Sequence, residues 1–221
     1  MKKIVLSGGG DENQTHLIDK YSIGLLPPNS SVLYVPIAWS TKDFGTCFEW
    51  FSHAYGKFGL KNITMWTDLK NKLFNDLAQF DAIYIGGGNT FSLLHQIKEA
   101  NFIKPLKEFI DSGKLVYGGS AGAIILGKTI ATASMGESAD KNLVGITDLL
   151  GLNEANGYAI QCHYEMAQEE EMVNFVKKDG IPIIALPKDA GLYLKDDEII
   201  SIGEGAVYLI ESDGIRTLNI Q

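Results

Sequence analysis

Residues 117–127 read YGGSAGAIILG and place a single serine, Ser120, among small residues. The apolar run at Lys114–Tyr117 comes before this stretch and the run AIILG ends it, a pattern that predicts a buried strand, a sharp turn and a helix. Gly118, Ser120 and Gly122 have the G-x-S-x-G spacing of a nucleophile elbow, in which small neighbours relieve crowding around a strained serine. A glycine-rich structural turn or a phosphate-binding turn would explain the same residues, so this alternative stays open here.

Short apolar runs alternate with helical patterns along most of the chain. Apolar runs predict strands at residues 3–6, 31–36, 82–85, 114–117, 157–161 and 182–186, and spacings of three and four predict helices at 46–57, 90–100, 102–112 and 166–178. Buried strands separated by helices indicate a mainly parallel sheet with helices on both faces. From residue 191 onward, short β-runs separated by KDDE, GEG and SDG predict an antiparallel extension. We expect one α/β domain over residues 1–221.

Composition excludes several classes of protein. The chain has 221 residues, 45% of them hydrophobic, so it can bury a sizeable core. Its formal charge of −8 argues against nucleic acid or an anionic membrane as partner, because both reward clustered lysine and arginine. The apolar run near the N-terminus is too short for a signal peptide, and no stretch reaches the roughly 18 apolar residues of a membrane span. We expect a cytoplasmic protein.

The two cysteines, Cys47 and Cys162, have neither metal-ligand spacing nor the density of a disulfide framework. We therefore expect reduced thiols and predict neither a metal nor a cofactor. Cys162 could act as a nucleophile beside His163, but adjacent residues on a strand point to opposite faces of a sheet. This reading of Cys162 is disfavoured.

A second glycine-rich loop, GGGNT at Gly86–Thr90, also follows a predicted strand and precedes a predicted helix. Loops at the carboxyl ends of neighbouring parallel strands converge, so this loop should lie beside the serine turn. The unobstructed amides of Gly87 and Gly88, with the amide of Ala121, are candidate donors to an oxyanion. Asn89 is a further substrate-binding candidate, and it is equally suited to capping the helix that follows.

A serine hydroxyl needs a base, and histidine is the usual one near neutral pH. His163 follows the strand-like YAIQC and should lie at the same edge as Ser120, although a histidine that only caps the strand is the alternative. His53 and His95 lie inside predicted helices and are expected to have packing or surface roles, whereas His16, in a polar loop, is a weaker candidate for the base.

A carboxylate should orient the histidine and support its positive charge. Glu137, in the loop ATASMGESADK, and Glu165, two residues after His163, are both arguable, and Asp140 and Asp189 are weaker candidates. The acidic run at residues 169–171 is expected to be a solvated helix face. The residues alone leave this choice open.

Three ordered segments carry a resemblance to a known family: IYIGGGNTFSLL at Ile83–Leu94, VYGGSAGAIILG at Val116–Gly127 and AIQCHY at Ala159–Tyr164. With the N-terminal loop Ser7–Asp11, which we expect at the edge of the site, the resemblance spans roughly residues 1–190. On these motifs the chain resembles peptidase family S51, the group of peptidase E and cyanophycinase.

The resemblance implies a flavodoxin-like fold similar to class I glutamine amidotransferases, with serine in place of their cysteine. It places the family serine on Ser120 and the family histidine on His163, and its acidic residue, in the loop after the nucleophile helix, favours Glu137 over Glu165. The implied activity is hydrolysis of small peptides by a serine-type, dipeptidase-like enzyme. Separately, we expect a monomer or homodimer. The alternatives are a non-catalytic small-molecule-binding protein on this fold and, less favoured because position 120 is serine, a glutaminase subunit.

One departure bears on specificity. Peptidase E prefers an N-terminal aspartate and would be expected to pair it with an arginine after the histidine, but this chain has HYEMAQEEEM there. Its one arginine is Arg216. Because carboxylates brought together without a cation repel each other, we expect the hydrolytic machinery without a strict preference for Asp-X substrates.

Overall fold

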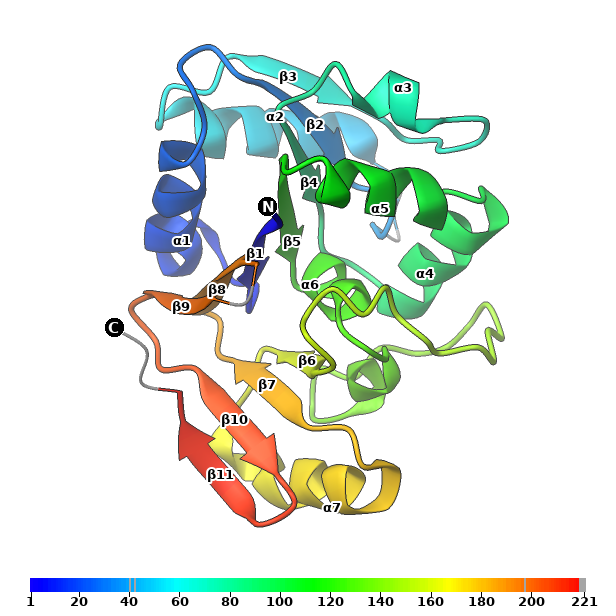
Figure 1. Cartoon of the computed structure of the whole chain (residues 1–221), viewed down its shortest axis with the longest axis vertical. Helices are drawn as coiled ribbons and strands as arrows, with labels where there is room; N and C mark the ends of the chain where they lie inside the picture. Colours follow the sequence, from blue (N-terminus) through cyan, green and yellow to red (C-terminus); the bar gives the residue numbers. More distant parts are fainter. Residues whose placement is uncertain (40, 42, 197, 219–221) are drawn as a thin grey trace.

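The structure is a computed structural model and describes residues 1–39, 41, 43–196 and 198–218. Its main sheet has seven strands in the order β3-β2-β4-β5-β1-β8-β9 (Figure 1). The strands are β1 (Lys3–Ser7), β2 (Ser31–Val35), β3 (Asn62–Met65), β4 (Ala82–Ile85), β5 (Leu115–Gly119), β8 (Ala190–Lys195) and β9 (Glu198–Gly203). The first five are mutually parallel, whereas β8 and β9 run antiparallel to their neighbours.

Helices cover both faces of this sheet, as the alternation of patterns predicts. On one face, Ile4 and Leu6 of β1 pack in the same core as side chains of α4 (Thr90–Glu99), α5 (Ile103–Asp111) and α6 (Ala121–Leu126). On the other face, Val5 packs with side chains of α1 (Glu12–Gly24) and α2 (Phe44–Gly56). A short helix, α3 (Phe74–Leu77), precedes β4. The buried, nearly all-apolar strands explain why the sequence reads as continuous apolar runs.

A second sheet corrects one expectation about the C-terminal region. It has four strands in the order β11-β10-β7-β6, namely β6 (Ala159–Cys162), β7 (Ile183–Leu186), β10 (Tyr208–Glu211) and β11 (Gly214–Thr217). With α7 (Glu169–Asp179) it forms the lower end of the molecule in Figure 1. Only β8 and β9 extend the main sheet, because β8 pairs along the whole free edge of β1 and leaves no edge there for β6. One core cluster contains residues of both sheets, and the single-domain expectation stays a prediction.

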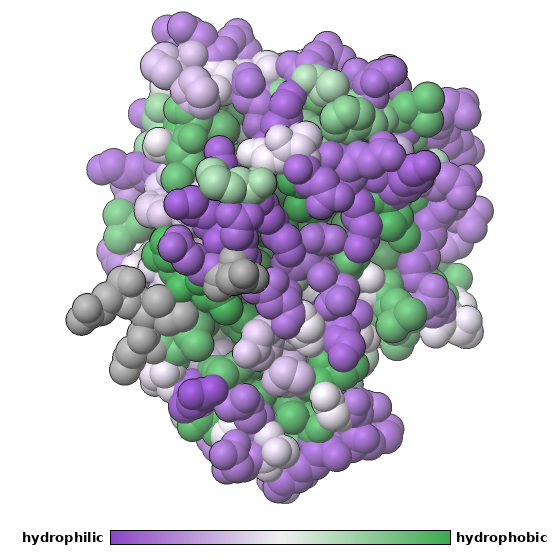
Figure 2. All heavy atoms as spheres, in the orientation of Figure 1, coloured by the Kyte–Doolittle hydropathy of each residue, from purple (hydrophilic) through white to green (hydrophobic). Residues whose placement is uncertain are grey.

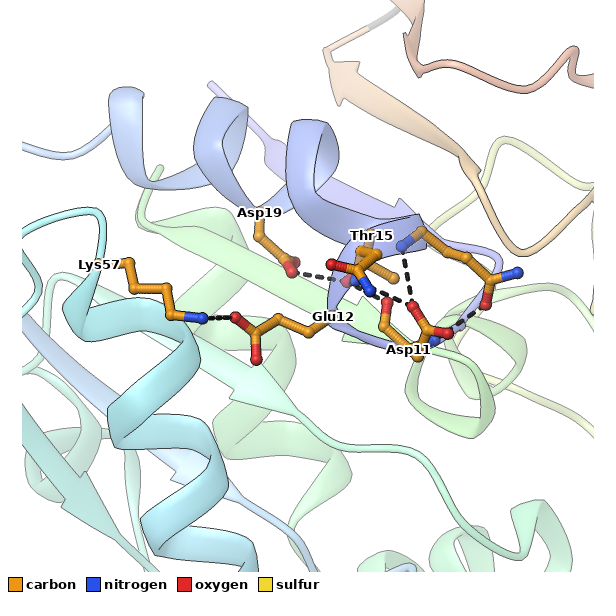
Figure 3. Close-up of polar contacts among 7 residues, drawn as sticks. Asp11, Glu12, Thr15, Asp19 and Lys57 are labelled. Atoms are coloured by element: carbon orange, nitrogen blue, oxygen red, sulfur yellow. Dashed lines mark hydrogen bonds and ion pairs between the residues drawn. The ribbon is translucent and has the colours of Figure 1, made fainter.

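The elements that the sequence-based predictions miss include the short helix α3, the longer helix α1 and the strand β3. The helix α1 has the polar sequence ENQTHLIDKYSIG, without a clear apolar period, so His16 lies on a helix and not in a loop. Its start is fixed by Asp11, whose carboxylate accepts the amide hydrogens of Asn13 and Gln14 (Figure 3). The strand β3 alternates between exposed and partly buried residues at the sheet edge, and its four residues are too few for a strong pattern.

A buried carboxylate joins α1 to the strand that leads to Ser120. Asp19 accepts hydrogen bonds from the hydroxyls of Tyr55 at 2.6 Å, Tyr117 at 2.7 Å and Thr15 at 2.7 Å, the last drawn in Figure 3. Burial raises the pKa of Asp19, and the three hydroxyl donors partly oppose this rise. The network fixes α1 against β5, directly below the serine turn.

The outer surface agrees with the composition. Figure 2 shows hydrophilic side chains over most of one face, with smaller hydrophobic patches between them. Among the described residues, no helix has the length and apolar character needed to span a bilayer.

Candidate active site

The serine turn has the strand–turn–helix form that the sequence predicts. Ser120 lies between β5 and α6 with φ 50° and ψ −113°, a conformation that costs a non-glycine residue about 1–3 kcal/mol. A Cβ at Gly118 would lie 2.5 Å from the carbonyl oxygen of Gly122, and a Cβ at Gly122 would lie 2.2 Å from that of Ile85. Both flanking positions therefore require glycine, and the turn holds the serine hydroxyl at the carboxyl edge of the main sheet.

His163 comes from the other sheet and meets this hydroxyl. It follows β6 with φ 52°, and its Nε2 lies 2.8 Å from Oγ of Ser120. The loop after β1 holds both partners: the Ser120 amide donates to the carbonyl of Ser7 at 3.1 Å, and the His163 amide donates to that of Gly8 at 3.1 Å. Main-chain hydrogen bonds thus fix the two side chains relative to one another across the junction of the sheets.

Two glycine loops leave room for this pair. A Cβ at Gly9, whose φ is +76°, would lie 2.6 Å from Cβ of Ser120 and 3.1 Å from Cε1 of His163. A Cβ at Gly87 would lie 3.2 Å from Cβ of Ser120 on the other side. The structure therefore places the loop Ser7–Asp11 within the site and not only at its edge; the signal for this in the sequence is its three glycines directly after a strand.

The candidate oxyanion donors have free amides. Within the described part of the chain, the amides of Gly87, Gly88 and Ala121 donate no hydrogen bond. Gly88 adopts φ +134° against the carbonyl of Ala38, where a Cβ would lie 2.2 Å from that oxygen. Asn89 caps α4, since its side chain accepts the Ser92 amide at 2.9 Å. The expected cap is therefore present.

The environment of His163 favours the neutral ring. Burial lowers the pKa of His163, and the charge of Lys188 lowers it further, whereas Asp140 and the Gly9 backbone raise it. The backbone of Gly9 is close enough to act on the ring, but Nδ1 is buried and has no hydrogen-bond partner of acceptable geometry among the described residues. A neutral imidazole whose Nε2 can accept the proton of the Ser120 hydroxyl has the protonation state that a general base needs.

Among the described residues, no carboxylate is hydrogen-bonded to Nδ1. Glu137 and Glu165 are both exposed, and neither is hydrogen-bonded to His163. Asp140 is partly buried and accepts the amide hydrogen of Thr90 at 2.7 Å, at the start of α4. Asp189 lies in the turn before β8, where its carbonyl accepts the amide hydrogens of residues 204 and 205. Of the four candidates, Asp140 is the one whose charge acts on the pKa of His163.

The Cys162 side chain packs against the backbone of the serine turn. Its thiol is buried and contacts the carbonyl oxygens of Ser120 at 3.5 Å and Ser7 at 3.6 Å. Burial raises the pKa of this thiol far above its usual range, so the thiolate that a cysteine nucleophile requires is suppressed. The other histidines lie elsewhere, and the ring of His16 lies 5.2 Å from that of Phe58, tilted by 55°.

Comparison with solved structures supports the fold. A candidate peptidase E protein from Listeria monocytogenes EGD-e superposes with a TM-score of 0.73 at 23% identity, covering 93% of this chain and 100% of the other. A peptidase from an acI-B1 Actinobacterium superposes with a TM-score of 0.70 at 15% identity, covering 99% and 94%. At these identities the likeness shows the fold alone, the class I glutamine amidotransferase-like arrangement that the sequence resemblance implies.

Comparison of sequences supports the family. A peptidase E of Haemophilus influenzae is 25% identical over 190 residues, covering 82% of this chain and 84% of the relative. A peptidase E of Shewanella putrefaciens is 29% identical over 133 residues, and this match spans only 56% of the relative's length and 58% of this chain. The pattern that defines peptidase family S51 matches residues 4–202. With nearly the whole chain inside that match, this protein belongs to peptidase family S51.

Proposed function

We propose that this protein is a serine peptidase that hydrolyses small peptides, with Ser120 as nucleophile and His163 as general base. The observation that carries the proposal is the 2.8 Å contact between Oγ of Ser120 and Nε2 of His163. Both residues adopt positive φ, so each is held in a costly conformation that brings the two side chains together. Strain of this kind concentrates at functional sites.

In the proposed reaction, Oγ of Ser120 attacks the carbonyl carbon of the scissile peptide bond while His163 accepts the hydroxyl proton. The amides of Gly87, Gly88 and Ala121 stabilise the negative charge that develops on the carbonyl oxygen. His163 then gives its proton to the leaving nitrogen, the bond between that nitrogen and the carbonyl carbon breaks, and the amine departs to leave the acyl-enzyme. A water molecule, deprotonated by His163, attacks the ester and releases the first product and Ser120.

The contacts that support the choice of the acidic residue are weaker than the contact between Ser120 and His163. We favour Asp140 over Glu137, the residue that the family resemblance implies, because Asp140 is partly buried and its charge raises the pKa of His163. A fixed negative charge near the ring stabilises the imidazolium that forms during the reaction. Asn89 assists this arrangement by donating from its side-chain amide to the carbonyl of Lys141 at 3.0 Å, beside Asp140.

The substrate is proposed to be a dipeptide without a strict requirement for N-terminal aspartate. The relatives that are named peptidase E suggest the substrate size. Arg216, the single arginine, lies on β11 and pairs with Glu211 at 2.9 Å, so it is already engaged in the second sheet. A dipeptide library separates the possibilities, and turnover confined to Asp-X peptides would contradict this part of the proposal.

A fluorophosphonate probe tests the central assignment. We expect it to label the wild-type protein, Ser120→Ala to abolish labelling, and His163→Ala to slow it strongly. A small-molecule-binding protein on this fold would leave Ser120 unlabelled. The cytoplasmic location, the absence of a nucleic-acid partner and the monomeric or homodimeric state remain predictions from composition and resemblance.

A further inference from the structure

Four neighbouring strands of the main sheet line up the parts of the site along one edge. The order β4-β5-β1-β8 places, in sequence along that edge, the Gly87 loop, Ser120, the Gly9 loop and the turn that contains Lys188. Since β8 is antiparallel to β1, with Ser7 opposite Gly191, the residues before β8 reach the edge at which β1 ends. Lys188 therefore belongs to the site by topology, although it lies 68 positions beyond Ser120 in the chain.

The β7–β8 turn packs directly on the loop that separates it from Ser120. A Cβ at Gly8 would lie 1.9 Å from the carbonyl oxygen of Pro187, and a Cβ at Gly10 would lie 3.1 Å from Cβ of Lys188. Gly9, between them, is the residue in contact with Ser120 and His163. Two consecutive glycines, Gly9 and Gly10, thus lie between the reacting pair and the start of the Lys188 side chain.

The proposed chemistry fixes the direction in which the substrate lies along this edge of the sheet. The scissile oxygen must face the amides on the β4 side of Ser120, whereas the leaving amine must face His163, which lies against Gly9 on the β1 side. The residue that departs with the amine therefore extends toward β1 and β8. In a dipeptide, this residue carries a free carboxylate about 3–4 Å from the scissile carbonyl carbon.

The distance fits the reach of a lysine. Adjacent strands are about 4.8 Å apart, so β8 lies about 10 Å from β5 along the edge. The dipeptide's own carboxylate covers about 3–4 Å of this span, and a four-carbon lysine stem covers about 6 Å. Lys188 is exposed, and within the described ranges no carboxylate lies within ion-pair distance of its ammonium group. Its charge nevertheless reaches the ring of His163.

We propose that Lys188 binds the free carboxylate of the leaving residue and thereby selects peptides that end one residue after the scissile bond. The inference rests on the proposed function and adds a specificity-determining residue to it. It also gives a reason for dipeptide length: a longer substrate has an uncharged amide at the position of this carboxylate and cannot form the ion pair.

The test compares one dipeptide with its C-terminal amide. The dipeptide is the best substrate of a library, and both forms are assayed at pH 8.5, where His163 is neutral with or without the charge of Lys188. We expect wild type to prefer the free acid about 10- to 100-fold in kcat/KM, as for one charge-assisted contact. In Lys188→Met the preference should fall to about twofold, because activity on the acid falls much further than activity on the amide.

Lys178→Met is the matched control, because Lys178 is an exposed lysine on α7 and lies outside the row of strands that forms the site. It should leave the acid-to-amide ratio at the wild-type value. A wild-type ratio near one, or an unchanged ratio in Lys188→Met, would overturn the inference.

A second pair of substrates, Asp-Leu and Asn-Leu, tests whether Lys188 instead binds the side-chain carboxylate of the first residue. If Lys188→Met removes a preference for Asp-Leu and not the preference for a free C-terminus, Lys188 binds the first residue and the inference is wrong. Fluorophosphonate labelling of Ser120 is independent of any substrate carboxylate. Normal labelling of Lys188→Met with an unchanged ratio refutes only the role of Lys188, whereas absent labelling in wild type refutes the proposed function.

Discussion

The two ring nitrogens of His163 have very different surroundings. On the Nε2 side, Ser120 and the ring are held at 2.8 Å by main-chain hydrogen bonds to the loop after β1 and by two glycines that pack against Ser120. On the Nδ1 side, no partner is present in the described structure. The nearby segment 134–141 is mostly exposed. Its hydrogen bonds include one from the Asp140 amide to the Ala133 carbonyl and one from the Gly136 amide to the Glu171 carboxylate. The fold thus brings together the proposed nucleophile and base, while the proposed acid lies on a mostly exposed loop.

Replacing His163, and with it the contact between Nε2 and Ser120, should have the largest effect on activity. We expect His163→Gln to lower kcat/KM for dipeptide hydrolysis by at least about 10³-fold, because nucleophile and base act as one unit. His53→Gln, at an exposed position on α2, should retain wild-type activity. Steady-state kinetics with purified variants of equal melting temperature check this, and a loss below tenfold in His163→Gln would remove the assigned base.

Adding a single methyl group beside Ser120 should also disturb the contact between Ser120 and Nε2, with a smaller loss of activity. In Gly9→Ala the new Cβ would lie 2.6 Å from Cβ of Ser120, at a φ of +76° that alanine adopts only with strain. We expect kcat/KM to fall about 10²-fold, since small misplacements of reacting groups carry losses of this size, and stability to fall by about 1–3 kcal/mol. Urea denaturation measures the second quantity.

Gly24→Ala is the matched control for this change. A Cβ at Gly24, the last residue of α1, would meet no atom within 4 Å, and its φ is not in the left-handed region. This variant should keep full activity and gain about 0.4–1 kcal/mol of stability. Equal activity losses in both glycine variants would show that the effect does not come from the contact with Ser120.

The Nδ1 side should respond less to substitution. We expect Asp140→Asn to lower kcat about tenfold, because it removes the charge that supports the imidazolium without breaking a hydrogen bond to the ring. Glu137→Gln should change kcat less than threefold, since Glu137 is exposed. Single-turnover kinetics on both variants compare them, and a larger loss in Glu137→Gln would assign the acid to Glu137, as the family resemblance implies.

The contrast between the two ring nitrogens also explains which site residues can be predicted from the sequence. Ser120, His163 and the glycines occupy fixed positions next to strands, so local pattern locates them and parallel pairing of β4 and β5 brings the loops together. Nothing local shows that β6 leaves the main sheet, because that depends on β8 taking the edge of β1 through a pairing of distant residues. Lys188 is missed for the same reason.

The acid is ambiguous because a loop has no period that fixes the direction of its side chains. Four carboxylates lie at plausible positions in the sequence, and the pattern does not distinguish them. Helix α1 illustrates the same limit in regular structure, since its stability depends on the buried contact between Asp19 and the hydroxyls of Tyr55 and Tyr117, residues far along the chain.

The smallest expected effect is a shift in pH dependence, and it sharpens the comparison between the two ring nitrogens. Burial lowers the pKa of His163, so the acidic limb of kcat/KM should have its midpoint below the usual value of about 6.5 for histidine. Asp140 opposes this shift, so Asp140→Asn should move the midpoint to still lower pH, whereas Lys188→Met should move it higher.

The same shift has a consequence for folding stability. Because the folded-state pKa of His163 lies below the unfolded value, the unfolded chain binds the proton more readily. The stability from the neutral ring is therefore complete above the unfolded pKa and is lost as pH falls toward and through the folded one. The wild-type protein should lose this stability over the same pH range in which it loses activity, and His163→Gln should lack this component of the pH dependence in urea denaturation. A pH profile of stability that is identical in both proteins would mean that the ring titrates in the folded state as it does in water.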